Sequence, residues 1–159
     1  MSDQPLDEID RQILYLLQED ARNNTNTEIA EQVGVSPSTV GKRINRLETT
    51  GTIKGYNPDI DYELADYPLR VLFICSTSIT ERSDLLEQVR EIRGVVNVKE
   101  LMTGQENVHI EVVGSHNEDI TRLATTIDDL GITINEEILV KNEYPQPASV
   151  FKPDEEWSG

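Results

Sequence analysis

The sequence has few of the residues that cross-link a chain or bind metals. It has one cysteine in 159 residues, so no disulfide bond can form within the chain. Cys75 stands in the apolar run VLFIC, which favours a small buried side chain over a reactive thiol. The only two histidines, His109 and His116, fall on different expected elements, and no set of cysteine, histidine and aspartate has the spacing of metal ligands. We therefore expect no metal site.

Long hydrophobic runs are also missing. No apolar stretch approaches the roughly 18 residues that a membrane-spanning helix needs. The first ten residues, MSDQPLDEID, are acidic and polar, unlike a signal or transit peptide. A composition of 36% hydrophobic and 28% charged residues is typical of soluble globular proteins. We expect a cytoplasmic protein that does not associate with membranes.

Signatures of catalysis are absent as well. There is no glycine-rich phosphate loop, and no nucleophile has a base at a recognisable spacing. Carboxylates are plentiful but scattered, as on a solvated acidic surface. The sequence therefore predicts no catalytic residues, no cofactor and no enzyme.

Basic residues are scarce: 14 lysines and arginines oppose 30 acidic residues, for a formal net charge of -16. That balance alone argues against nucleic acid, because phosphates repel an acidic protein. The few cations are not evenly spread, however, since Lys42, Arg43, Arg46 and Lys54 cluster with only Glu48 among them. An acidic chain with few lysines is also typical of a very salty cytoplasm, where a Debye length of about 3 Å at 1 M salt screens the repulsion. We therefore hypothesise a halophilic origin.

The most informative stretch is SPSTVGKRINRL, residues 36–47. Ser36 is a suitable N-cap and Pro37 fits the first helical position, so a helix is predicted to begin here. Helical spacing places Val40, Ile44 and Leu47 on one stripe that can pack. The other side carries hydrogen-bonding groups and positive charge: Ser38, Lys42 and Asn45 opposite the stripe, and Thr39 and Arg46 on its flank. In so acidic a chain, DNA is the leading candidate partner for such a surface.

Two further helices are expected before this one. Residues 6–20 have apolar residues at helical spacing after the capping residue Asp7, and a short helix follows from Thr25 or Asn26 to the stop at Gly34. A short helix, a glycine turn and a second helix form a helix-turn-helix. The following GTIKGYNP predicts a short turn or a wing. Helix pairs also occur in bundles that bind no DNA, and this alternative stays open.

The second half of the chain predicts a sheet with two helices. The expected elements are a strand at 69–79, a helix at 83–93, strands at 95–102 and 108–113, a helix at 117–130 and a strand at 132–140. This β-α-β-β-α-β order is the ferredoxin-like split arrangement, so the fold class is α+β. The predicted organisation is a helix-turn-helix domain at 1–56, a linker at 57–68, the βαββαβ domain at 69–144 and a flexible acidic tail at 145–159, with Phe151 and Trp157 as candidate anchors.

The first of these strands is apolar on both faces. Val71, Phe73 and Cys75 alternate with Leu72 and Ile74, although a ferredoxin-like sheet has helices on one face only. A second sheet, most simply from an identical chain, would cover the other face. We therefore predict a homodimer built on the second domain.

The order of elements matches a known family. The segments LDEIDRQILYLLQEDAR and TEIAEQVGVSPSTVGKRINRLETTGTIKGY resemble the N-terminal half of the leucine-responsive (Lrp/AsnC, or feast/famine) family of bacterial and archaeal transcription regulators, and the resemblance continues through the βαββαβ half. It implies a winged or plain helix-turn-helix that reads a palindromic operator in double-stranded DNA, and a sensing domain that dimerises and often stacks into octamers. With the acidic composition, it suggests a haloarchaeal member.

The resemblance also suggests which residues meet DNA. The second helix of the motif enters the major groove, with Ser38, Thr39, Lys42, Asn45 and Arg46 facing bases or phosphates. Arg43 lies closer to the packed stripe, so we assign it to a phosphate or to an intramolecular ion pair. The residues Arg22, Thr25 and Lys54 are expected to contact the DNA backbone and set the register.

An effector site is implied at one loop of the second domain. In the family, small effectors, commonly amino acids, bind between dimers near the loop that is here Leu101, Met102, Thr103, Gly104, Gln105, Glu106 and Asn107. Relatives usually have an aspartate three residues after the glycine, whereas this chain has Asn107, whose neutral amide would hold an ammonium group less strongly. Either Glu106 substitutes or the ligand differs, and a plain hairpin turn without a ligand remains open. A coregulator that only joins hetero-oligomers with sister chains is the alternative function.

Overall fold

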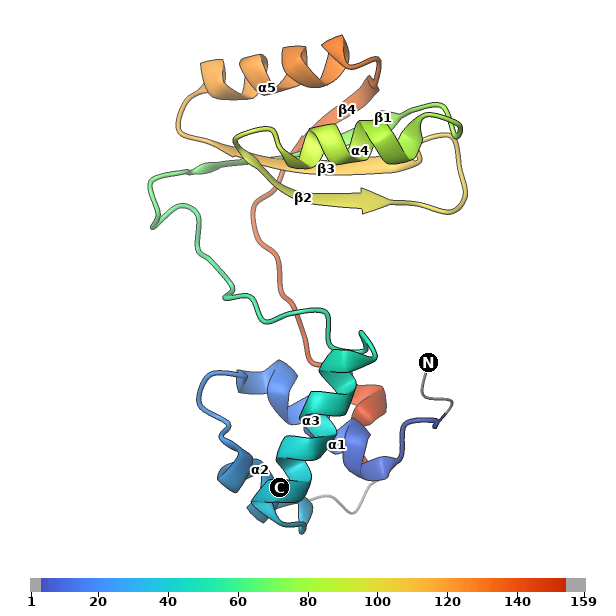
Figure 1. Cartoon of the computed structure of the whole chain (residues 1–159). Helices are drawn as coiled ribbons and strands as arrows, with labels where there is room; N and C mark the ends of the chain where they lie inside the picture. The colour runs from blue at the N-terminus through green and yellow to red at the C-terminus, as the bar shows by residue number, and fades with distance from the viewer. Residues whose placement is uncertain (1–3, 154–159) are drawn as a thin grey trace. The chain divides into compact units, whose positions relative to one another are not determined.

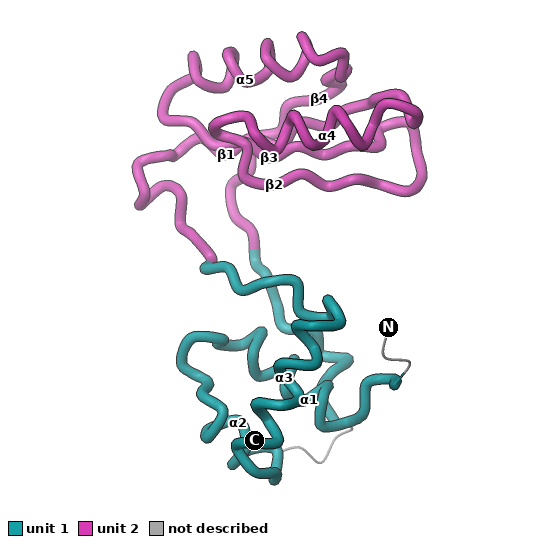
Figure 2. Tube along the Cα trace, in the orientation of Figure 1, with its two compact units in different colours: residues 1–58, 144–159 teal, residues 59–143 magenta. Residues whose placement is uncertain are grey.

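The computed structural model describes residues 4–153, and these divide into two compact units (Figure 2). The first unit contains residues up to Pro58 together with the segment that begins at Tyr144, and the second contains Asp59–Glu143. Helices dominate the first and an antiparallel sheet with helices forms the second (Figure 1). The expected α+β class is confirmed.

Three helices form the first unit, and their starts follow from the capping residues. They are α1 (Glu8–Asp20), α2 (Asn26–Val33) and α3 (Pro37–Thr49). Asp7 and Thr25 each form a capping box, and the Ser36 side chain accepts a hydrogen bond from the Thr39 backbone N–H. The chain turns between α2 and α3 at Gly34, whose φ of +83° is a left-handed conformation that glycine adopts without strain. All three predicted helices are confirmed.

The core of the first unit joins the three helices. Its buried members come from α1, α2 and α3: Ile13, Leu14, Leu16, Ile29, Ala30, Val40 and Leu47. After α3, the chain turns back and the Ile53 N–H donates to the Leu47 carbonyl at 2.9 Å. The sequence predicted either a short turn or a wing for the GTIKG segment. No residue of 50–58 is in a strand, so the segment is a turn.

The second unit contains β1 (Leu69–Ser76), α4 (Arg82–Arg90), β2 (Val95–Glu100), β3 (Val108–Gly114), α5 (Asn117–Asp129) and β4 (Thr133–Leu139). Its sheet has the order β2-β3-β1-β4 with antiparallel neighbours throughout, which is the predicted ferredoxin-like arrangement. Several elements are shorter than predicted: β2 ends at Glu100 rather than 102, α5 loses one residue at its end, β4 loses one at each end, and the largest differences are in β1 and α4. β1 ends at Ser76 rather than 79, and α4 ends at Arg90 rather than 93, because a turn leads from there to Gly94 at φ +106°.

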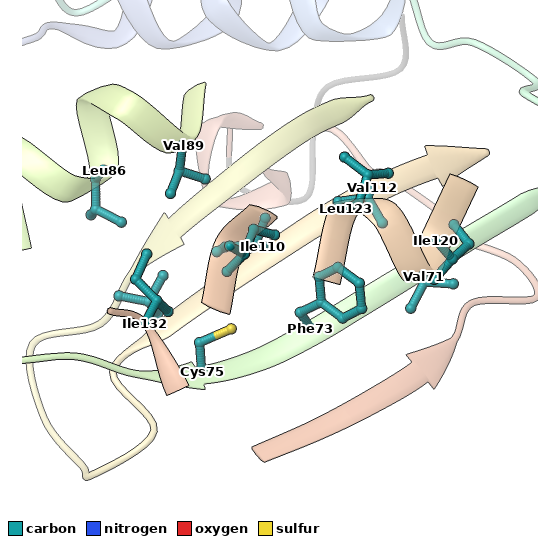
Figure 3. Packing of buried hydrophobic residues seen from close by; sticks show 12 residues of the cluster. Val71, Phe73, Cys75, Leu86, Val89, Ile110, Val112, Ile120, Leu123 and Ile132 are labelled. Atoms are coloured by element: carbon teal, nitrogen blue, oxygen red, sulfur yellow. The ribbon is translucent and has the colours of Figure 1, made fainter. Parts of the chain in front are cut away.

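Both helices of this unit lie on one face of the sheet (Figure 1). Val71, Phe73 and Cys75 of β1 belong to one buried cluster with Val89 of α4 and Leu123 of α5 (Figure 3). Cys75 is fully buried, which confirms the prediction of a small buried side chain, and burial raises the pKa of its thiol to about 12.

The C-terminal segment differs from the predicted flexible tail. The Ala148 N–H donates to Gln18 Oε1 at 3.0 Å, and the Lys152 ammonium lies 5.0 Å from the centroid of the Tyr15 ring. Phe151, in the short 3-10 helix η1 (Ser149–Phe151), packs against the core of the first unit. Residues 148–152 are therefore a strap on α1, held by the apolar ring that the sequence singled out as an anchor. Trp157, the other candidate anchor, lies outside the described residues.

Candidate nucleic-acid interface

α3 has one buried and one exposed side. Val40 and Leu47 are buried at 0% and 1% relative exposure, which confirms the predicted packing stripe. Ser38, Lys42 and Asn45 are exposed, as the helical spacing predicted. We call these three residues the polar row of α3. It presents a hydroxyl, an ammonium and an amide along one line of the helix, a set of groups that can bind base edges and phosphates.

The start of α3 adds further hydroxyl groups. Ser36 Oγ lies 3.1 Å from Ser38 Oγ and 2.8 Å from Thr39 Oγ1. Thr39 is half-buried, so its hydroxyl is less accessible than that of Ser38. The first turn of α3 therefore combines hydroxyls with the positive end of the helix dipole, which favours a negatively charged partner.

A glycine within α3 allows the two helices of the motif to approach closely. A Cβ atom at Gly41 would lie 3.2 Å from Nδ2 of Asn26 at the start of α2. The sequence analysis did not assign Gly41 a role, although a glycine inside a helical pattern is a signal for close packing. Thr25, expected to contact the DNA backbone, is used in the cap of α2: its hydroxyl donates to Glu28 Oε2 at 3.0 Å and accepts from the Glu28 N–H at 3.2 Å.

The two arginines of α3 lie on the flank that faces α1. Arg43 Nη1 forms ion pairs with Asp7 and with Asp10, the latter at 3.2 Å. Arg46 Nη2 forms an ion pair with Asp10, and its Nη1 donates to Gln4 Oε1 at 3.0 Å. For Arg43 the ion-pair alternative is therefore confirmed. For Arg46 the structure shows that a buried carboxylate on α1 binds its guanidinium, and the expected DNA contact stays a prediction.

Asp10 organises this cluster, and the sequence analysis missed it. It is 0% exposed, and its Oδ2 also accepts the Asp7 N–H at 3.2 Å within the capping box of α1. The one local signal was the D-x-x-D spacing of Asp7 and Asp10, which predicts a cap but says nothing of the arginines 33 and 36 residues further on. A buried carboxylate is costly unless charges and hydrogen bonds compensate it, and here both do.

The cluster of Asp7, Asp10, Arg43 and Arg46 carries two negative and two positive charges, so it is neutral overall. The hydrogen bond from Arg43, followed by the backbone N–H of Asp10, lowers the pKa of Asp7 below its ordinary value. The same contact with Asp7 raises the pKa of Arg43. Asp7 and Arg43 are therefore held in their charged forms, and the fields of these opposite charges cancel at a distance.

The remaining predicted DNA contacts lie at the two turns of the first unit. Arg22 is exposed in the turn between α1 and α2, and Lys54 is exposed in the turn after α3. Neither forms an ion pair with any of residues 4–153. Both are available to bind phosphate.

The expected effector loop is closed at its base. The Leu101 N–H donates to the Asn107 carbonyl at 2.8 Å, and Asn107 itself is 7% exposed. Its side-chain Nδ2 donates to the Thr77 carbonyl at 2.9 Å, while its Oδ1 accepts from the Thr77 N–H at 3.0 Å. The Asn107 amide therefore ties the loop to the end of β1, and its expected contact with an effector stays a prediction. The residues that stay exposed are Met102, Thr103, Gly104, Gln105 and Glu106.

Among residues 4–153, no three His, Cys, Asp or Glu side chains are placed to hold a metal ion. The helices within this range include none that is both long enough and apolar enough to cross a membrane.

Comparison with known proteins defines the class to which this arrangement belongs. Residues 6–54, which contain α1 to α3, match the family described as winged helix-turn-helix DNA-binding. AldR, an HTH-type transcriptional regulator of Mycobacterium tuberculosis, is 34% identical over 72% of this chain and 65% of its own length. Its crystal structure superimposes with a TM-score of 0.74 at 28% identity, covering 90% of this chain and 99% of that one.

The match to a second relative extends over most of both chains. LysM, an HTH-type transcriptional regulator of Saccharolobus solfataricus, is 32% identical over 82% of this chain and 87% of its own length. The leucine-responsive regulatory protein of Rhizobium meliloti is 38% identical over 50% of this chain and 49% of its own length. The chain belongs to the Lrp/AsnC family of HTH-type transcriptional regulators.

Proposed function

We propose that this protein regulates transcription by binding double-stranded DNA at a specific sequence, with α3 in the major groove. The observation that carries the proposal is the exposed polar row of Ser38, Lys42 and Asn45 on α3 of the helix-turn-helix. An asparagine amide can recognise adenine through two hydrogen bonds, and a lysine can donate to guanine or to phosphate. Thr39 supports the row, and Arg22 and Lys54 bind the DNA backbone on either side.

The test is a gel shift on DNA from upstream of the chain's own gene, comparing the wild type with Lys42→Ala/Asn45→Ala. We expect the double variant to bind at least about tenfold more weakly, because each good base contact contributes about 1–3 kcal/mol. Lys141→Ala is the matched control, since it removes an exposed cation from the second unit and should leave binding unchanged. Equal binding by the double variant and the wild type would refute the assignment of α3.

We also propose a homodimer that forms through the helix-free face of the sheet, with octamers as the higher assembly. Leu72 and Ile74 of β1 lie on this face, and Leu72 is paired with Ile138 of β4, which is 43% exposed. Beside them, Arg70 forms an ion pair with Glu111. An apolar centre with a fixed ion pair at its side is suited to a self-complementary interface.

Leu72→Glu tests the dimer, because it places like charges on both sides of the proposed interface. Sedimentation at molar KCl is expected to give a dimer or larger species for the wild type and a monomer for the variant. Leu64→Glu, at a position that is 84% exposed, serves as the control and should keep the wild-type assembly. A wild-type monomer would rule out this interface.

A small metabolite is proposed to modulate the regulator at the loop of residues 101–107, between second units. Because the Asn107 amide is bound to Thr77, recognition falls to Thr103, Gln105 and Glu106. Of these, Glu106 is the one group that can attract an ammonium ion through charge. A thermal-shift screen of amino acids at high salt, repeated with Glu106→Gln, measures whether a ligand binds and whether its binding depends on the Glu106 charge.

The alternative proposal is a coregulator that joins hetero-oligomers with sister chains and does not bind DNA specifically by itself. It predicts assembly in the sedimentation experiment together with no specific gel shift.

The net charge of -16 also supports the proposed haloarchaeal origin. If the origin is haloarchaeal, the fold is expected to be more stable in molar KCl than in dilute buffer, because salt screens the repulsion between its acidic residues.

A further inference from the structure

Two of the three cations of α3 form ion pairs with carboxylates of the described residues, and the third does not. Arg43 and Arg46 both form ion pairs with the buried Asp10, and Arg43 also pairs with Asp7. Lys42 is exposed and pairs with no carboxylate in the described part of the chain. Asp10 is therefore the one carboxylate among these ion pairs that binds both arginines of α3.

The geometry indicates that this restraint is strong. Asp10 is 0% exposed, while the Arg43 and Arg46 side chains are 25% and 30% exposed. Moving either guanidinium to a phosphate would leave the buried carboxylate short of compensation, which is more costly than losing a surface ion pair. The arginines are thus held against α1 although solvent reaches them.

We propose that Asp10 is a positioning residue that withholds Arg43 and Arg46 from DNA phosphates, so that α3 approaches the duplex with Lys42 as its one uncompensated cation. This inference rests on the proposed function, because it concerns how α3 distinguishes its operator from other DNA. Sequence preference then depends on neutral groups, chiefly those of Ser38 and Asn45. Nonspecific attraction to the phosphate backbone stays weak.

This arrangement has a measurable consequence in the dependence of binding on salt. Each phosphate that a protein neutralises on duplex DNA adds about 0.9 to the slope of log affinity against log salt. Two arginines per subunit that are released from Asp10 would make the slope steeper by about 1–2 per subunit. They would also raise affinity for every sequence, so the ratio of specific to nonspecific affinity would fall.

The experiment compares the full-length wild type with Asp10→Asn on a random-sequence duplex and on the upstream DNA, over a range of KCl concentrations. Asn keeps the size of the side chain and an oxygen that can accept the Asp7 N–H, but it cannot hold two guanidinium groups by charge. We expect a steeper salt slope, severalfold tighter binding to the random duplex and a smaller preference for the upstream DNA. Thermal melts verify that the variant is folded.

Asp7→Asn is the second variant, because Asp7 is exposed and its replacement leaves the buried position intact. It removes one of the two carboxylates that bind Arg43 and leaves Arg46 bound to Asp10, so a smaller increase in the salt slope is expected. Glu19→Gln is the charge-matched control: it removes one negative charge from an exposed position of α1 that has no ion pair with residues 4–153, and its slope should equal that of the wild type.

Three outcomes overturn the proposal. A shallower slope for Asp10→Asn would mean that Asp10 orients the arginines toward phosphate rather than away from it. An unchanged slope in a folded Asp10→Asn would mean that the ion pairs do not limit DNA contact. A slope for Glu19→Gln as steep as that for Asp10→Asn would assign the effect to net charge alone. If the wild type showed no preference for the upstream DNA over the random duplex, that result would count against the proposed function. The salt slopes measured on the random duplex would still test the role of Asp10.

Discussion

Replacing Arg43 and Arg46 together by alanine is expected to lower the free energy of unfolding of the first unit by about 3–5 kcal/mol, the cost typical of a buried charge that loses its partners. Both arginines bind Asp10, whose side chain is fully buried. Without them the carboxylate keeps only the hydrogen bond from the Asp7 N–H. The measurement is thermal or urea unfolding followed by far-UV circular dichroism.

Two further variants identify the cause of that loss. Lys42→Ala removes a cation from the same helix at an exposed position, so its effect should stay within about 0.5 kcal/mol. Adding Asp10→Leu to the double variant removes the buried charge and should recover much of the lost stability, because apolar replacements of buried ion pairs are often neutral or stabilising. If the double variant were as stable as Lys42→Ala, the ion pairs would not be structural.

Phe151→Ala is expected to destabilise the first unit by about 1–2 kcal/mol, because its ring is half-buried and full burial of such a side chain contributes about 1.5–3 kcal/mol. Phe151 packs against the core of helices α1 to α3, although it lies about a hundred residues beyond α3. Beside it is a cavity of about 430 Å³ that Leu14, Leu17 and Ile53 also line, so truncation of the ring would enlarge an existing space.

Val150→Ala is the matched control for the strap, because the neighbouring Val150 is 80% exposed. Its unfolding should match that of the wild type. If Phe151→Ala also matched the wild type, the strap would lie on the first unit without stabilising it, and the helix-turn-helix would be complete at Pro58.

Local chemistry made much of this fold predictable. Ser36 and Pro37 fix the start of α3, Gly34 fixes the turn before it, and alternation along residues 69–76 identifies β1 with its two apolar faces. Each of these signals lies within a few residues of the element that it specifies. The positions of Ser38, Lys42 and Asn45 on the free side of α3 follow from the helical period alone.

The features that the sequence did not reveal depend on contacts between distant residues. Nothing near Asp10 shows that it will be buried under Arg43 and Arg46, because that depends on how α3 crosses α1. Asn107 likewise gained its role from Thr77, 30 residues earlier, and not from the loop in which it stands. In both cases side chains that were expected to meet a ligand, the two arginines and Asn107, are bound to groups of the protein itself.

The most direct test of the central claim, that the polar row of α3 reads DNA, is selection of binding sites from a random duplex pool at high KCl. The wild type is predicted to enrich a palindromic sequence, and Lys42→Ala/Asn45→Ala is predicted to lose that enrichment while its melting temperature is unchanged. Enrichment of the same sequence by both proteins, or of no sequence by the folded wild type, would contradict the account.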